Sequence, residues 1–126
     1  MLDATHVTAL KRYASAVEHA ERSDFGGKAD PGSATLWAIA DRVARHVAGI
    51  PVRFTAIEAA TLAGAGDRLH QECEISLSHG EALSDEQRAR ARGWLGIAHA
   101  LHDVAAGMRE SASAEADEPS GAVRHG

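Results

Sequence analysis

Cysteine and aromatic residues are scarce in this sequence. Cys73 is the only cysteine among 126 residues, and aromatic side chains make up 4 %. One cysteine excludes an internal disulfide framework, which makes a reducing compartment the expected location. Because alanine dominates the apolar content of 44 %, we expect a core of thin side chains between closely spaced helices.

Positive charge and long apolar runs are also lacking. Lysine and arginine number 13 against 18 acidic residues, for a formal charge of −5. Nucleic acids and anionic membranes attract clustered positive charge, so this balance argues against both as partners. No apolar run approaches the roughly 18 residues that a membrane span needs. The opening MLDATHVTALKRY has no basic start followed by an apolar stretch, so we expect no signal peptide and a cytoplasmic protein.

Four segments have the apolar spacing of amphipathic helices. They run from about Asp3 to Glu21, from Ser33 to about Ala48, from Thr55 to just before Gly80, and from Ser84 to about Glu110. Ser33 is the expected N-cap of the second helix, and the third and fourth begin with capping boxes, Thr55 with Glu58 and Ser84 with Gln87. Short loops join the helices, so the pattern predicts an all-α domain over residues 1–110, an antiparallel bundle of four main helices.

The remaining segment, 111–126, reads SASAEADEPSGAVRHG. It is acidic, has few large apolar groups and contains both proline and glycine. This composition predicts a disordered acidic C-terminal tail.

Small residues form a stripe on each of the last two helices. The stripes are Gly93, Gly96, Ala100 and Gly107 on the fourth, and Ala56, Ala60, Ala63 and Gly64 on the third. A glycine inside a helix costs roughly 1 kcal/mol relative to alanine, which is best tolerated where a second backbone comes close. We therefore expect the two faces to meet. Gly64 and Gly66 leave open whether the third helix is continuous.

The fourth helix is apolar around more than one face. Its large apolar residues include Trp94, Ile97, Leu101, Val104 and Met108. A helix of this kind is either central in its domain or shared with a partner. One hypothesis is a homodimer with these residues at its interface. The alternative is that Ile97 and Val104 are covered by Phe25 and its loop.

Histidine and cysteine at helical spacing suggest a metal site. His70 with Cys73, and His99 with His102, each place two side chains on one helix face. Histidine and cysteine together suit zinc. The alternative is that the histidines lie at the edges of the helix contacts and that Cys73 is a small core residue.

The sequence supports catalysis and DNA binding less well than it supports a homodimer or a metal site. Cys73 lies mid-helix between Glu72 and Glu74, which disfavour the thiolate that a nucleophile needs. The sequence AATLAGAG, residues 59–66, resembles the turn of a helix-turn-helix over 59–73, but acidic residues in the following helix would face phosphate. The leading prediction is a small non-enzymatic protein that acts through protein–protein contact, ahead of a metal- or small-ligand-binding bundle and a DNA-binding regulator.

Overall fold

The computed structural model describes residues 1–23, 31–79 and 82–123, with side chains described through residue 112. It contains α1 (Ala4–Arg22), α2 (Ser33–Val47), α3 (Ala56–Leu77) and α4 (Asp85–Val123), and the described residues form no strand. The prediction of an all-α fold with four main helices is confirmed. No helix within the described ranges is both long and apolar enough to cross a bilayer.

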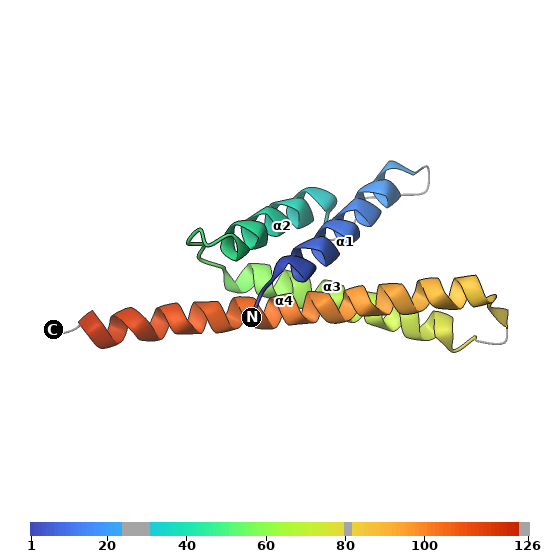
Figure 1. The fold of residues 1–126 in the computed structure, drawn as a ribbon. Coiled ribbons are helices and arrows are strands. Elements are labelled where there is room, and N and C mark those ends of the chain that lie inside the picture. The colour runs from blue at the N-terminus through green and yellow to red at the C-terminus, as the bar shows by residue number, and fades with distance from the viewer. Residues whose placement is uncertain (24–30, 80–81, 124–126) are drawn as a thin grey trace.

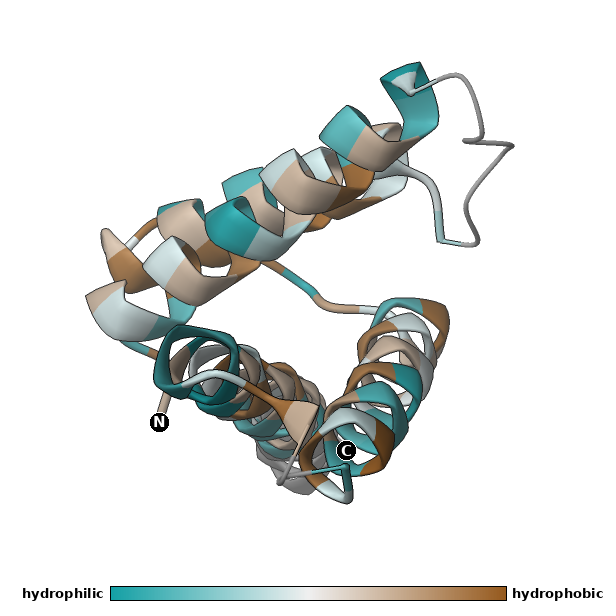
Figure 2. Ribbon diagram, turned by 90° about the vertical axis from the view of Figure 1, so that its right-hand side faces the viewer, coloured by the Kyte–Doolittle hydropathy of each residue, from teal (hydrophilic) through white to brown (hydrophobic). Residues whose placement is uncertain are grey.

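The helices form two layers, each a pair of consecutive antiparallel helices (Figure 1). α1 and α2 lie side by side in one layer, which is inclined to the longer α3–α4 pair below it, as Figure 2 shows. α3 makes its main contact with α4, and α1 connects the upper layer to α4. α4 thus lies centrally, in contact with both layers.

The core lies where these helices meet. Its largest fully buried side chains are Leu10, Leu36, Val43, Leu62, Leu101, Val104 and Met108. Alanine fills much of the remaining space, with Ala14, Ala40, Ala59, Ala65, Ala98 and Ala105 all buried. The expected core rich in thin side chains is therefore present.

Reciprocal hydrogen bonds set the starts of α3 and α4, as the sequence predicts. The Thr55 hydroxyl accepts from the Glu58 N–H at 3.1 Å, and the Glu58 carboxylate accepts from the Thr55 N–H at 2.8 Å. Ser84 and Gln87 exchange the same two bonds at 3.1 and 2.9 Å. Both pairs satisfy backbone donors that the first helical turn leaves unpaired.

The start of α2 differs from the prediction. Gly32 is the N-cap and makes no side-chain cap, while Ser33 lies in the first turn. Glu21 of α1 accepts hydrogen bonds from both the N–H and the hydroxyl of Ser33. A carboxylate from the neighbouring helix therefore supplies the cap, favourably placed at the positive end of the helix dipole.

Arg42 connects α2 to the start of α3. Its Nε lies 2.6 Å from a Glu58 carboxylate oxygen, and its guanidinium also donates to the Arg53 carbonyl. The same guanidinium lies 5.9 Å from the centre of the Phe54 ring. Glu58 thus closes the capping box and anchors the α2–α3 connection.

We expect Glu58→Ala to lower the free energy of unfolding by about 1–2 kcal/mol, because it removes a cap and leaves Arg42 without its carboxylate partner. Glu58→Gln should cost less, since its amide oxygen still accepts from the Thr55 N–H. Urea unfolding followed by circular dichroism measures both losses. An alanine variant as stable as the wild type would contradict this role of Glu58.

Two further expectations concern the lengths of α3 and α4. α3 is uninterrupted through Gly64 and Gly66. α4 continues past Glu110 to Val123, and Figure 1 shows that this end projects beyond the other helices. Alanine, serine and glutamate in 111–117 are compatible with a helix, although they offer it no large apolar stripe. Residues 124–126 of the predicted tail lie outside the described residues.

The two small-residue faces do not meet as predicted. A Cβ added at Gly93 or Gly96 would have no neighbouring atom within 4 Å, and one at Gly64 would meet only the Arg68 side chain. The close approach occurs at Gly66, where a Cβ would lie 3.0 Å from the His102 ring and 3.2 Å from the Ala98 carbonyl oxygen. Of the α4 stripe, Gly93 and Gly96 are exposed, whereas Gly107 is buried against Leu2 of the N-terminal segment rather than against α3.

Candidate functional site

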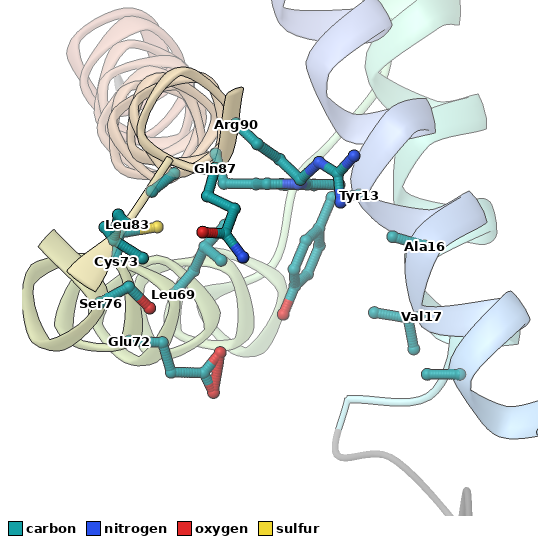
Figure 3. Close-up of a pocket in the computed structure, with 13 residues that line it drawn as sticks. Tyr13, Ala16, Val17, Leu69, Glu72, Cys73, Ser76, Leu83, Gln87 and Arg90 are labelled. Atoms are coloured by element: carbon teal, nitrogen blue, oxygen red, sulfur yellow. The ribbon is translucent and has the colours of Figure 1, made fainter. Parts of the chain in front are cut away.

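A cleft of about 510 Å³ lies between α1 and the α3–α4 pair (Figure 3). Three helices line it. The lining residues are Tyr13, Ala16, Val17 and Ala20 of α1, Leu69, Glu72, Cys73 and Ser76 of α3, and Gln87, Arg90, Ala91 and Trp94 of α4. Each set occupies positions i, i+3, i+4 and i+7, which is about two turns of one helix face. Leu83, from the connection between α3 and α4, also lines it.

Burial sorts this lining into an apolar interior and a polar mouth. Cys73 is buried, and Tyr13, Val17, Leu69 and Trp94 are half-buried and apolar or aromatic. The polar lining residues Glu72, Ser76, Gln87 and Arg90 are all exposed. Space remains between the walls because alanine occupies several positions where larger side chains would fill it.

The two titratable side chains in the interior of the cleft, Tyr13 and Cys73, are neutral. Burial raises the pKa of the Tyr13 phenol, with Arg68 acting to lower it and Glu72 to raise it. Burial also raises the pKa of the Cys73 thiol, and Glu72 adds to that shift. The direction for Cys73 agrees with the sequence-based expectation, but the main cause is burial, which the flanking glutamates did not indicate. A neutral thiol at pH 7 is a poor nucleophile and adds an apolar surface.

The four predicted metal ligands do not converge. His102 Nε2 lies 2.7 Å from an Asp67 carboxylate oxygen, and the His70 and His99 rings meet edge to face at 5.5 Å between centroids. Cys73 instead lines the cleft. Within the described ranges no group of three or more histidine, cysteine or acidic side chains is placed to hold a metal ion. Spacing along one helix does not specify which neighbours each side chain meets once two helices have packed, so the zinc hypothesis is not carried forward.

The predicted interface residues lie in the core of the single chain. Ile97, Leu101, Val104 and Met108 are buried, and Trp94 is half-buried in the cleft. The chain's own helices cover these side chains, so they form no exposed patch. Phe25, the residue expected to cover two of them, lies outside the described residues.

The helix-turn-helix hypothesis required a turn within residues 59–66. α3 is one continuous helix from Ala56 to Leu77, with Ala59, Leu62, Ala65 and Gly66 buried on its inner side. The segment therefore has no turn, and the hypothesis is not retained.

The outer face of α3 is a surface that the sequence analysis missed. Ile57 and Ile75 are 78 % and 55 % exposed, and the small residues Ala60 and Gly64 lie between them. The two isoleucines are 18 residues apart, about five helical turns, so they point in the same direction. This spacing was visible in the sequence, but it was hidden by the stronger apolar stripe on the opposite face of the same helix.

Comparison with known proteins found no matching family, no similar curated protein and no similar solved structure. The cleft and the outer face of α3 are the two surfaces from which a function can be argued.

Proposed function

We propose that this is a small non-enzymatic helical protein that acts through protein–protein contact and forms a homodimer through the outer face of α3. The observation that carries the proposal is the pair Ile57 and Ile75, two large aliphatic side chains exposed on one face of a long helix. Self-association remains the expected activity. Its location moves from α4 to α3, because the large α4 side chains are used in the core.

The spacing of the isoleucines suits a second copy of the same helix. They are about 27 Å apart along α3. If two α3 helices pack antiparallel about a two-fold axis level with residue 66, Ile57 of each copy faces Ile75 of the other. A two-fold interface uses the same patch on both subunits, as this register does.

The residues between the isoleucines include two small ones and one arginine. Ala60 and Gly64 carry little or no side chain, which favours a helix contact at their positions. The Arg68 guanidinium lies 3.9 Å from where a Cβ on Gly64 would be, so the interface would include this side chain. Dimerisation would then bury each isoleucine, and full burial of such a side chain contributes about 1.5–3 kcal/mol of favourable free energy. The cytoplasm is the proposed compartment, in keeping with the single cysteine, and the net charge of −5 disfavours nucleic acid and anionic membranes as partners.

We expect the wild type to be a dimer and Ile57→Glu or Ile75→Glu to be monomeric. A charge placed opposite an apolar side chain should weaken association by at least about tenfold in Kd. Native mass spectrometry and light scattering over a range of protein concentrations measure this change.

Ile50→Glu is the matched control, because Ile50 is 51 % exposed and lies outside α3. It should dimerise as the wild type does. A wild type that stays monomeric at every concentration, or a dimer that survives both α3 substitutions, would overturn the proposal.

A further inference from the structure

We propose that the cleft between α1 and the α3–α4 pair binds a small apolar molecule that carries one anionic group. Its volume of about 510 Å³ falls within the 300–1,000 Å³ typical of small-ligand sites. The site is separate from the outer face of α3, so this proposal does not depend on the homodimer.

The interior of the cleft fits the apolar part of such a molecule. Tyr13 and Trp94 offer aromatic surface from two helices, Leu69 and Val17 offer aliphatic surface, and the buried Cys73 thiol is neutral. The charged lining residues lie at the exposed mouth, and an apolar body would bury none of them. Removal of apolar surface from water therefore drives binding.

The mouth fits an anionic group on its α4 side. Gln87 accepts a hydrogen bond from the Ser84 N–H through its carbonyl oxygen, which leaves the amide NH₂ as the group turned toward the cleft, as Figure 3 shows. Arg90, one turn further along α4, extends over the cleft toward Tyr13 in the same view. Guanidinium and amide NH₂ groups can only donate, so together they select an acceptor such as a carboxylate or sulfonate.

Competition for Arg90 within the chain is weak. Its guanidinium lies 3.7 Å from Glu86, and both side chains are largely exposed, at 71 % and 85 %. An exposed pair of this kind contributes little to stability. Glu72 lies on α3, away from Arg90 and Gln87 in Figure 3, which leaves the anionic group to the α4 residues.

Two fluorescent probes with the same aromatic body test the proposal. Anilinonaphthalene sulfonate carries one anionic group, and N-phenylnaphthylamine carries none. We expect the wild type to bind both at one saturable site, with the sulfonate bound more tightly. Arg90→Gln should weaken binding of the sulfonate probe by about tenfold in Kd and change the Kd of the uncharged probe by less than about twofold. Arg92→Gln, an exposed arginine on the opposite face of the same helix, is the matched control and should change neither.

Filling the cleft tests where the apolar body binds. Ala16→Leu and Ala91→Leu each add a side chain into the space between the walls, and leucine is a good helix former, so the fold should remain intact. Both variants should weaken the binding of both probes by about tenfold or more in Kd, while the helix content stays unchanged. Equal binding by wild type and both filled variants would overturn the site.

Cys73 provides an independent readout, since it is the only cysteine and it lines the cleft. A bound probe should slow its alkylation by a small thiol reagent in proportion to occupancy. Probe binding that leaves the alkylation rate unchanged would place the probe elsewhere and overturn the proposal. Ile57→Glu lies outside the cleft and should bind both probes as the wild type does, so failure of the homodimer can be distinguished from failure of this site.

Discussion

Replacing Leu101 with alanine is expected to lower the free energy of unfolding by about 2–5 kcal/mol. Leu101 is fully buried on α4, the helix that contacts both layers. The substitution removes its apolar contacts and leaves a cavity that rigid neighbouring helices fill only in part. Since a domain of this size is stabilised by roughly 5–15 kcal/mol, the loss is a large share of the total.

Urea unfolding gives this loss directly, and Ile75→Ala provides the control. Ile75 is 55 % exposed, so its truncation should change the unfolding free energy of a single chain by less than about 0.5 kcal/mol. Both measurements are best made in the Ile57→Glu background, where the proposed dimer is absent. A small loss for Leu101→Ala there would show that this residue does not support the monomer core, and would return it to the interface predicted from the sequence.

Local chemistry explains why the helices were predictable. Helix starts depend on residues within one turn, such as Thr55 with Glu58 and Ser84 with Gln87, and both boxes form as expected. The start of α2 shows the limit of this reasoning. Its cap is Glu21, which is 12 residues before Ser33 and belongs to another helix. No local pattern specifies that bond.

The candidate sites were less predictable, because they depend on how the helices face one another. Periodicity predicted that His70 and Cys73 share a face of one helix, but in the packed structure Cys73 lines the cleft and the His70 ring lies against His99. The cleft itself is made of three ordinary amphipathic faces, each unremarkable along the chain. It depends on how the α1–α2 layer lies against the α3–α4 pair, to which Figure 2 shows it inclined.

The same substitution at two glycines is expected to change stability in opposite directions. Gly66→Leu should cost about 1–3 kcal/mol, the usual range for an overpacked contact, whereas Gly96→Leu should add up to about 1 kcal/mol. Leucine forms helices better than glycine at both positions. The difference between the two variants therefore isolates what surrounds each Cβ.

A new side chain has close neighbours at Gly66 and none at Gly96. At Gly66 the new side chain would meet the Ala98 carbonyl oxygen at 3.2 Å, which shifts only if α4 moves. It would also displace the His102 ring, which lies 3.0 Å away and is held 2.7 Å from Asp67. At Gly96 no neighbouring atom lies within 4 Å.

Thermal and urea unfolding of the two variants measure the difference. Equal changes at both positions would contradict the close approach at Gly66. Opposite changes would show that one glycine on α3, rather than the glycine stripe on α4, permits the spacing of these helices. That spacing also positions Leu69 of α3 and Trp94 of α4, which both line the cleft, so Gly66→Leu should weaken binding of the uncharged probe as well. Gly96→Leu, on the exposed face, should leave that binding unchanged.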